Sequence, residues 1–238
     1  MYKLRFKNDD EIEVGLDEAG RGCLWGPLFV GAVAFSDSLE DFPDGGELLK
    51  QLKDSKVLTK KRKDLLYDYI IESALGWSVA SVTAVEVDAE NVLQADMTAM
   101  HRALDALSVP IGRCLVDGDY WRPYKGVESH VIVDGDAQYL AIAAAGILAK
   151  VSRDRWVAAA VAADPTLDTR YGLGSNMGYG TAAHLAGLAS HGITPEHRRT
   201  FGPVAAVLGL PTRSGKHKKK TGTGTVTGTE THGFIVNP

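Results

Sequence analysis

The run Asp17-Glu18-Ala19-Gly20-Arg21-Gly22 places two adjacent carboxylates, an arginine and two glycines at the end of a predicted buried strand. Adjacent carboxylates at such a place are costly, because burial disfavours their charged form and the two charges repel each other. A divalent cation would remove both costs. The glycines on either side of Arg21 would let the backbone approach a ligand closely, since a Cβ would block it. The pattern favours a metal-holding site that acts on a phosphodiester.

Two further acidic groups follow predicted strands, at Asp117-Gly118-Asp119 and at Asp134-Gly135-Asp136. A single Asp-Gly pair is more typical of a turn than of a ligand. Here several acids leave strand ends at separate points of the chain, which a set of ordinary turns would not require. Three or four converging carboxylates make an oxygen-rich site, which suits Mg²⁺ or Mn²⁺ better than zinc or copper.

The elements that would position these acids are alternating strands and helices. Alternating or continuous apolar runs predict strands at 11–17, 27–36, 77–82, 113–117 and 130–133. Helical spacing, alanine content and capping predict helices at 60–73, 88–107, 138–163, 181–190 and 195–208. This order predicts an α/β fold, with a mixed β-sheet flanked by helices and a helical C-terminal part.

Composition indicates a globular protein of ordinary type. The 238 residues are 45% hydrophobic and 24% charged. No apolar run approaches the roughly 20 residues of a membrane helix and no secretory leader is evident, so we expect a soluble, cytoplasmic protein. Cys23 and Cys114 are expected to be reduced thiols.

Charge along the chain is uneven. The formal net charge of −4 argues mildly against a nucleic-acid partner, but basic side chains crowd the stretch 50–63. After Pro211 a basic run is followed by Thr-Gly repeats. We therefore divide the chain into a catalytic domain at 1–211 and a disordered tail at 212–238. The tail is either a solvated extension or a weak, salt-sensitive tether for nucleic acid.

The ordered motifs resemble ribonuclease HII over about residues 12–208. The opening Asp17 to Gly22, continued by Cys23-Leu24 and Gly26-Pro27, is similar to the signature of that family. The later matches, in order, are Asp54-Ser55-Lys56 with Leu58, Asn91, Val116-Asp117-Gly118, Gly135-Asp136-Ala137, the segment 143–151, Arg153-Asp154, Gly178-Tyr179-Gly180-Thr181 with His184, and His197-Arg198 with 201–204. One such motif would be weak evidence, whereas the ordered series is strong.

The resemblance implies an RNase H-like fold and an endoribonuclease. It would hydrolyse the RNA strand of RNA–DNA hybrids and cut 5′ of ribonucleotides embedded in duplex DNA, leaving 5′-phosphate and 3′-hydroxyl ends. Four carboxylates are implied to be catalytic and to hold two divalent ions, Mg²⁺ or Mn²⁺: Asp17, Glu18, Asp117 and Asp136. The implied substrate contacts are Gly20, Arg21 and Gly22 at the ribose 2′-hydroxyl, Tyr179 on the neighbouring sugar, and Lys56 and Lys150 near phosphate.

The chain departs from the family pattern at several places beside the expected site. Asp134 stands where a lysine is usual, Gln138 stands at another lysine position, and Asn176-Met177 replace His-Lys. Gly146 stands where serine is common. Three of these changes remove a potential cation, so affinity, metal requirement or substrate preference is expected to differ. If the strand before Asp136 continues, Asp134 would share its face; if the strand ends early, Asp134 is a solvated turn residue.

Three alternatives to a ribonuclease HII activity fit the sequence less well. A catalytically weak RNA–DNA binding module would carry four carboxylates as a liability beside phosphates. A nucleotide-binding turn of the P-loop kind does not fit, because the turn lacks a Gly-Lys-Ser/Thr ending. Ribonuclease HIII is disfavoured by the few residues before Asp17. We expect a monomer and no membrane partner, and leave open both a sliding-clamp partner and the choice between long hybrids and single ribonucleotides.

Two further features have ordinary interpretations. His184 and His191 are expected to be surface or capping groups rather than ligands. Trp121 either stacks on bases or packs within its own loop.

Overall fold

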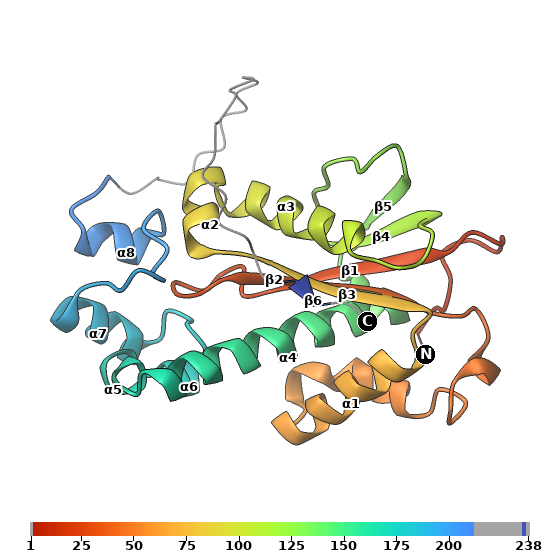
Figure 1. The fold of residues 1–238 in the computed structure, drawn as a ribbon, viewed down its shortest axis with the longest axis horizontal. Coiled ribbons are helices and arrows are strands. Elements are labelled where there is room, and N and C mark those ends of the chain that lie inside the picture. Colours follow the sequence, from red (N-terminus) through yellow and green to blue (C-terminus); the bar gives the residue numbers. More distant parts are fainter. Residues whose placement is uncertain (1, 212–234, 237–238) are drawn as a thin grey trace.

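A six-stranded mixed sheet forms the centre of the molecule in the computed structural model, which describes residues 2–211 and 235–236, without the side chains of 53–57 and 235–236 (Figure 1). The strands are β1 (Glu13–Ala19), β2 (Leu28–Ala34), β3 (Gly76–Val82), β4 (Arg113–Asp117), β5 (Glu128–Ile132) and β6 (Ile235–Val236). Their order in space is β5-β4-β1-β2-β3-β6. Strands β1, β4 and β5 run parallel, so their carboxyl ends meet at one edge of the sheet.

The pairing of β1 with β4 sets the position of the acids. In this pair Leu16 lies opposite Val116, so Asp17 and Asp117 follow side by side. Because side chains alternate along a strand, Asp17 and Glu18 face opposite sides of the sheet. Gly15 shares a face with Asp17, and a Cβ there would lie 2.3 Å from the backbone of Ala141. The glycine therefore lets a helix pack directly on β1 beside the acids.

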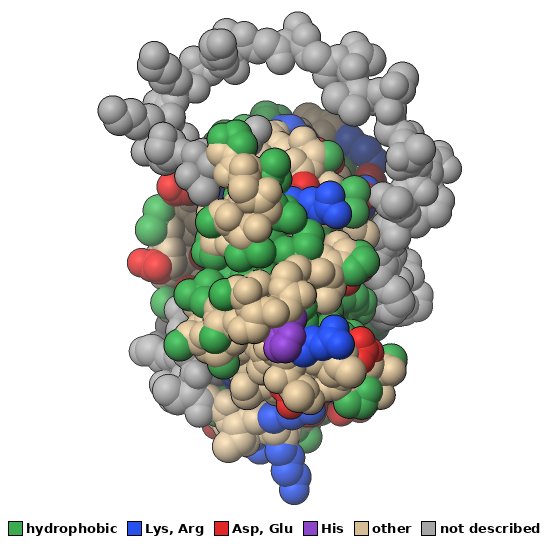
Figure 2. Space-filling model, turned by 90° about the vertical axis from the view of Figure 1, so that its left-hand side faces the viewer, with side chains coloured by type: hydrophobic (Ala, Val, Ile, Leu, Met, Phe, Trp, Pro, Cys, Tyr) green, Lys and Arg blue, Asp and Glu red, His purple; other side chains and the backbone are tan. Residues whose placement is uncertain are grey.

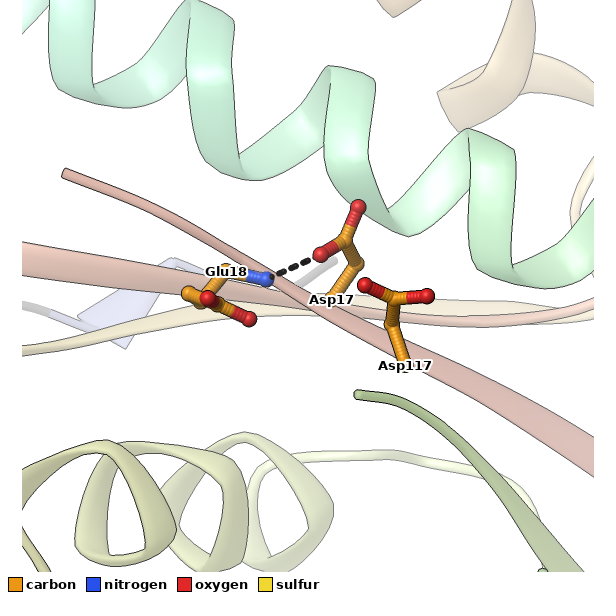
Figure 3. A group of neighbouring side chains, drawn as sticks. All are labelled: Asp17, Glu18 and Asp117. Carbon is orange, nitrogen blue, oxygen red and sulfur yellow. Dashed lines mark hydrogen bonds between the residues drawn. The ribbon is translucent and has the colours of Figure 1, made fainter. Parts of the chain in front are cut away.

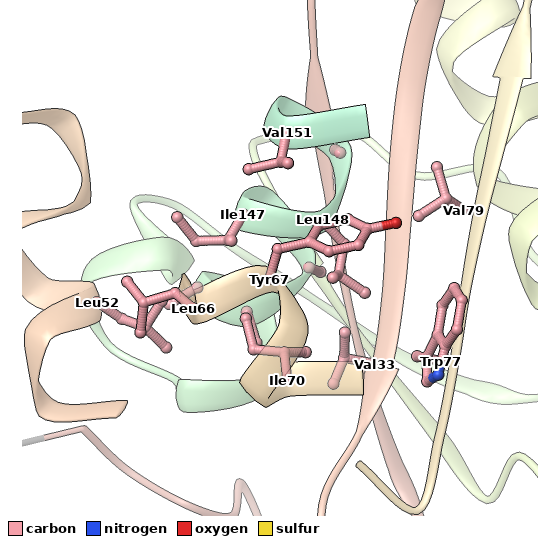
Figure 4. Close-up of a cluster of buried hydrophobic side chains, with 14 of the residues drawn as sticks. Val33, Leu52, Leu66, Tyr67, Ile70, Trp77, Val79, Ile147, Leu148 and Val151 are labelled. Atoms are coloured by element: carbon pink, nitrogen blue, oxygen red, sulfur yellow. The ribbon is translucent and has the colours of Figure 1, made fainter. Parts of the chain in front are cut away.

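Helices cover both faces of the sheet (Figure 1). The long helix α4 (Leu140–Ala163) crosses one face and α1 (Lys60–Ser73) packs against it. Their shared core includes Leu66, Ile70 and Leu148, all fully buried (Figure 4). The other face is covered by α2 (Ala84–Glu90) and α3 (Val92–Asp105). Thr59 caps α1 as predicted, by accepting from the backbone N–H of Arg62.

The single helix predicted at 88–107 is wrong, because the chain forms two helices there. Helix α2 begins after Thr83, whose side chain and that of Glu86 form a reciprocal capping box. Asn91 then adopts a positive φ of 74° and caps α3 by accepting from the N–H groups of Leu93 and Gln94. The apolar spacing of 88–107 was read correctly as helical, but the capping residue within it was not recognised as a break.

Short helices complete the C-terminal part and gather at one end of α4. They are α5 (Thr166–Tyr171), α6 (Leu173–Asn176), α7 (Ala182–His191) and α8 (Gly202–Val207). The helix predicted from 195 begins only at Gly202, where Pro203 occupies its first turn. Figure 2 shows this end of the molecule, where apolar and uncharged side chains cover most of the surface and charged groups are few.

Several smaller expectations meet the structure as follows. Cys23 and Cys114 are free and buried, as predicted. Trp121 packs edge-on against His101 of α3, with ring centroids 5.2 Å apart, so it packs against a core helix and not only within its own loop. Of the predicted tail, 212–234 and 237–238 lie outside the described residues, and Ile235–Val236 pair with β3, a contact the prediction did not include. Within the described residues no helix has the length and apolar character needed to cross a bilayer.

The short connecting helices are η1 (Leu39–Asp41), η2 (Leu48–Val57) and η3 (Gly135–Ala137). The last of these follows β5 directly and carries one of the expected acids.

Candidate active site

Three of the four expected carboxylates converge at the carboxyl ends of β1 and β4. One oxygen from each of Asp17, Glu18 and Asp117 lies within 4.8 Å of the others. Figure 3 shows that Asp17 is directed toward α4, whereas Glu18 is directed to the opposite side of the strand. The Asp17 Oδ1 accepts from the Glu18 backbone N–H at 2.7 Å, and the Asp117 Oδ1 accepts from the Gly135 N–H at 2.7 Å. The backbone itself holds these carboxylates in place.

Charge in this group is unbalanced. Burial, then the charges of Glu18 and Asp117, raise the pKa of Asp17 well above its usual value. Burial also raises the pKa of Asp117, and it raises that of Glu18 although Arg21 opposes the shift. Half-buried carboxylates that repel one another are stabilised by a multivalent cation. The donor set contains oxygen alone, so the residues present fit a hard divalent metal ion.

Asp136 lies beside this group rather than within it. It belongs to η3, and its charge raises the pKa of both Asp17 and Asp117. Together with Asp17 it lines a cavity of about 310 Å³. The structure thus brings the fourth expected carboxylate to the edge of the site but not within the 4.8 Å group.

Cationic and aromatic side chains line the other walls of this cavity. Lys150 and Tyr179, both expected from sequence, lie there with Lys63, which was not singled out. Lys150 pairs with Asp154 at 2.5 Å, and Tyr179 is 43% exposed. The basic stretch at 50–63 was the signal that could have identified Lys63. The side chain of Lys56 lies outside the described part, so its expected role stays a prediction.

The loop after Glu18 is held by two buried arginines. Arg153 of α4 donates to the carbonyl oxygens of Trp25, Pro27 and Met177, at 2.7–3.1 Å. Arg198 donates to the carbonyl oxygens of Gly26 and Arg21, both at 3.0 Å. Both guanidinium groups are almost fully buried. The loop that carries the expected 2′-hydroxyl contacts is therefore held in place by two side chains that are distant in sequence.

The two glycines of this loop differ in what they permit. Gly20 has a φ of +88°, and a Cβ there would lie 2.1 Å from Nε of Arg153, so the position requires glycine. A Cβ on Gly22 would meet nothing within 4 Å. Packing against Arg153 therefore accounts for glycine at position 20. The space beside Gly22 is open, so a ligand can approach the loop there.

Arg21 lies between two carboxylates. Its Nη1 is 3.6 Å from Glu18 Oε1 and 3.7 Å from Asp96 Oδ2. Asp96 is 1% exposed, and burial followed by the charge of Glu18 raises its pKa well above the usual value. Sequence reasoning missed Asp96, although an acid four residues after Val92 and four before Met100 interrupts an apolar helical stripe.

The expectation for His184 is wrong, because this side chain is fully buried. The His197 Nδ1 accepts from the Thr194 N–H at 2.8 Å, and the Nε2 atoms of His197 and His184 are 3.1 Å apart. The His184 Nδ1 in turn lies 3.0 Å from the Tyr179 carbonyl oxygen. These contacts require one neutral tautomer of each ring, and burial lowers both pKa values, that of His197 to about 4. His191, by contrast, is exposed at the end of α7.

The departures from the family pattern have local explanations. Strand β5 ends at Ile132, so the idea that Asp134 and Asp136 share a strand face is wrong. Asp134 is exposed with a φ of 53°, and the Gln138 side chain donates to the Val133 carbonyl oxygen at 2.8 Å, which closes the turn. The side chain of Asn176 accepts from the Gly178 N–H at 2.8 Å and so braces the turn before Tyr179.

Gly146 makes room for the first acid. A Cβ at this position of α4 would lie 2.3 Å from Oδ2 of Asp17. The carboxylate therefore occupies space that any larger residue would take, and it would have to move if one were present.

Comparisons with known proteins agree with this geometry. The family model "Ribonuclease HII" matches residues 14–203. Among curated relatives, a ribonuclease HII of Paracidovorax citrulli is 48% identical over 83% of this chain and 77% of its own, and one of Polaromonas sp. is 47% identical over 82% and 91%. Among solved structures, the ribonuclease H2 of Pyrococcus horikoshii has a TM-score of 0.65 at 26% identity, covering 82% of this chain and 96% of that one.

A second solved structure is the complex of PCNA with ribonuclease HII from Archaeoglobus fulgidus, with a TM-score of 0.57 and 27% identity over 78% of this chain and 91% of that one.

Proposed function

This chain belongs to the ribonuclease HII family of endoribonucleases, which cleave the RNA strand of RNA–DNA hybrids, and we propose that it also cuts 5′ of single ribonucleotides embedded in duplex DNA. The fold is RNase H-like and the activity depends on divalent metal. The observation that supports the proposal most is the convergence of Asp17, Glu18 and Asp117 within 4.8 Å, beside a cavity lined by two lysines and a tyrosine.

Four carboxylates are proposed to hold the metal, namely Asp17, Glu18, Asp117 and Asp136. The first three already meet, and Asp136 faces the same cavity as Asp17. Bound in a pair, Mg²⁺ or Mn²⁺ would supply an activated water and stabilise the leaving 3′ oxygen, which yields 5′-phosphate and 3′-hydroxyl ends. The backbone N–H groups that hold Asp17 and Asp117 keep these ligands oriented before any substrate arrives.

The chain's other residues are proposed to select and orient the substrate. The Gly20-Arg21-Gly22 loop would read the ribose 2′-hydroxyl, since Gly22 leaves open space and the loop is fixed by Arg153 and Arg198. Tyr179, partly exposed at the cavity wall, would stack on the neighbouring sugar. Lys63 and Lys150 would contact phosphate, because both line the same cavity.

A single-ribonucleotide duplex tests the proposal directly. The protein is incubated with a labelled DNA duplex that contains one ribonucleotide, with Mg²⁺, with Mn²⁺ or with a chelator. We expect cleavage 5′ of the ribonucleotide, with 3′-hydroxyl and 5′-phosphate products, and none in chelator. Cleavage of an all-DNA duplex at the same rate, or robust cutting in chelator, would contradict it. Cutting of a long hybrid alone would leave the family activity intact and reject the embedded-ribonucleotide specificity.

We also propose that the chain acts as a monomer, because all four acids and the loop that faces them come from one chain. Light scattering at assay concentration tests this, and a dimer mass would contradict it.

A further inference from the structure

Asp96 is a buried carboxylate that the proposed mechanism does not use. It lies in the middle of α3 and is 1% exposed, among buried apolar neighbours of that helix such as Met97 and Met100. Neither of its oxygens accepts a hydrogen bond from any described residue. A buried carboxylate without donors is strongly destabilising. An apolar residue would fit this face of α3 better, so packing does not account for Asp96.

The one cation near Asp96 among the described residues is Arg21. Its Nη1 lies 3.7 Å from Asp96 Oδ2 and 3.6 Å from Glu18 Oε1. Both distances are too long for hydrogen bonds and short enough for ion pairs. A single guanidinium therefore lies between a proposed metal ligand on β1 and a buried acid on α3. This places α3 in electrostatic contact with the site.

We propose that Asp96 is a positioning residue that holds the Arg21 guanidinium at the floor of the active site. The inference rests on the proposed roles of Arg21 and Glu18. Two described carboxylates, Glu18 and Asp96, lie within 4 Å of this guanidinium. If Glu18 bound a metal ion, Asp96 would be the one left to attract Arg21. Asp96 then keeps Arg21 from swinging out to the nearest phosphate.

The backbone of Arg21 is held independently. Arg198 donates to its carbonyl oxygen at 3.0 Å, while Asp96 attracts its guanidinium from the opposite layer of the fold. Holding both ends of Arg21 keeps the N–H groups of the loop in one orientation. Preorganised groups of this kind act on the reacting geometry, so a loss of the contact from Asp96 should affect substrate recognition more than stability.

A double-mutant cycle tests the proposal. The variants are Asp96→Asn, Arg21→Ala and both together, assayed as full-length protein on the single-ribonucleotide duplex with kcat and KM measured separately. We expect Asp96→Asn to lower kcat/KM about tenfold, mainly through KM. In the Arg21→Ala background the same change should have no further effect. The melting temperature of Asp96→Asn should be unchanged or higher, by roughly 2–4 °C, because a buried charge is removed.

Asp105→Asn is the matched control, since it removes the same charge from the exposed end of the same helix and should leave kcat/KM unchanged. Asp96→Ala repeats the test if the amide of the first variant impairs folding. An equal loss in both backgrounds, or a fall in melting temperature that accompanies the loss, would show that Asp96 is merely structural. Normal activity of Asp96→Asn beside impaired Arg21→Ala would overturn the inference alone, whereas normal Arg21→Ala would overturn the proposed role of Arg21 and the inference with it.

Discussion

The two ends of the strand pair β1–β4 both carry charged side chains, but these are ion-paired at the amino ends and are mainly clustered carboxylates at the carboxyl ends. At the amino ends the buried Arg113 pairs with Glu13 at 2.6 Å, Asp9 at 2.7 Å and Glu128 at 3.2 Å. At the carboxyl ends Asp17 and its neighbours meet without an equal number of cations. At the amino ends Lys7 also pairs with Glu128, and Arg5 with Asp9, so the acids there have cationic partners. The two strands, about 23 Å and about 16 Å long at roughly 3.3 Å per residue, thus bear a balanced cluster at one end and an unbalanced one at the other.

The direction of the pKa shifts separates the two clusters. The ion pairs at the amino ends lower the pKa of Asp9, and hydrogen bonds from Lys7 and His130 lower that of Glu128 to about 2. At the carboxyl ends burial and mutual repulsion raise the pKa of Asp17 and Asp117. A paired cluster serves the fold, whereas an unpaired one weakens it unless a ligand is bound. The opposite directions of these pKa shifts distinguish the proposed active-site end of the strand pair from the end that is stabilised by ion pairs.

Asp17→Asn should have the largest effect, because it removes a proposed metal ligand while keeping its shape. We expect turnover to fall by about 10³-fold or more, the effect of several kcal/mol of lost transition-state stabilisation. The metal-free melting temperature should be equal or higher, and Mn²⁺ or Mg²⁺ should no longer raise it. Cleavage assays and thermal melts with and without metal measure both, and near-normal turnover would show that Asp17 is not a ligand.

Arg113→Met, at the amino ends of the strands, should lower stability and leave activity unchanged, the reverse of the effect of Asp17→Asn. Removing the guanidinium leaves the buried carboxylate of Glu13 without its cation and should cost about 3–5 kcal/mol of unfolding free energy, with kcat of the folded enzyme unchanged. Denaturant melts and single-turnover cleavage below the melting temperature separate the two. Arg5→Met is the control, since it removes the same charge from a partly exposed pair and should cost less than about 1 kcal/mol. Equal losses for both variants would contradict the contrast.

Gly146→Ala should damage the unbalanced end without weakening the fold. The new Cβ would force Asp17 to move, so activity should fall about 10- to 100-fold. Alanine favours the helix, so the melting temperature should not drop. Gly202→Ala, where a Cβ would meet nothing within 4 Å, is the control. Unchanged kcat for Gly146→Ala would mean that Asp17 tolerates the shift.

The pH dependence of stability should have opposite signs at the two ends. A carboxyl group whose pKa is raised in the folded state stabilises the fold at low pH and loses this contribution as the pH rises through the folded-state pKa. A carboxyl group whose pKa is lowered in the folded state stabilises the fold at higher pH and loses this contribution as the pH falls through the folded-state pKa. In chelator, the melting temperature of Asp17→Asn minus that of wild type should therefore grow from pH 4 to pH 8. For Glu128→Gln the deficit should instead shrink toward pH 2. Effects of His197 are common to all these proteins and cancel in the differences. Differences that do not vary with pH would refute the assignment.

Asp134→Lys should have the smallest effect. Asp134 is exposed in a turn after β5 and does not share a strand face with Asp136. We expect KM to change less than about twofold at physiological salt, as for a distant exposed charge. A clear gain in affinity at low salt, with a steeper salt dependence, would show that this turn does contact the substrate.

The sequence predicted which acids converge at the site better than it predicted the buried side chains that contact the residues around them. Parallel strands that each end in an acid must bring those acids to one edge, so the convergence of Asp17 with Asp117 follows from strand order. The contact of Asp96 with Arg21 depends on how α3 crosses β1, and no local pattern encodes that. The His184–His197 contact joins two segments through tertiary packing. The break at Asn91 was missed because helical periodicity continues through it.

The arginines that fix the active-site loop have a consequence for synthesis. Arg153 contacts the carbonyl oxygens of Trp25 and Pro27, which lie 128 and 126 residues earlier, and Arg198 contacts Gly26 and Arg21, 172 and 177 residues earlier. A nascent chain acquires all four proposed metal-binding acids by Asp136, long before Arg198 is made. Contacts of such long range form late in folding. A chain still on the ribosome would therefore contain the proposed metal-binding acids and the loop beside them, but not yet the Arg198 contacts that fix this loop.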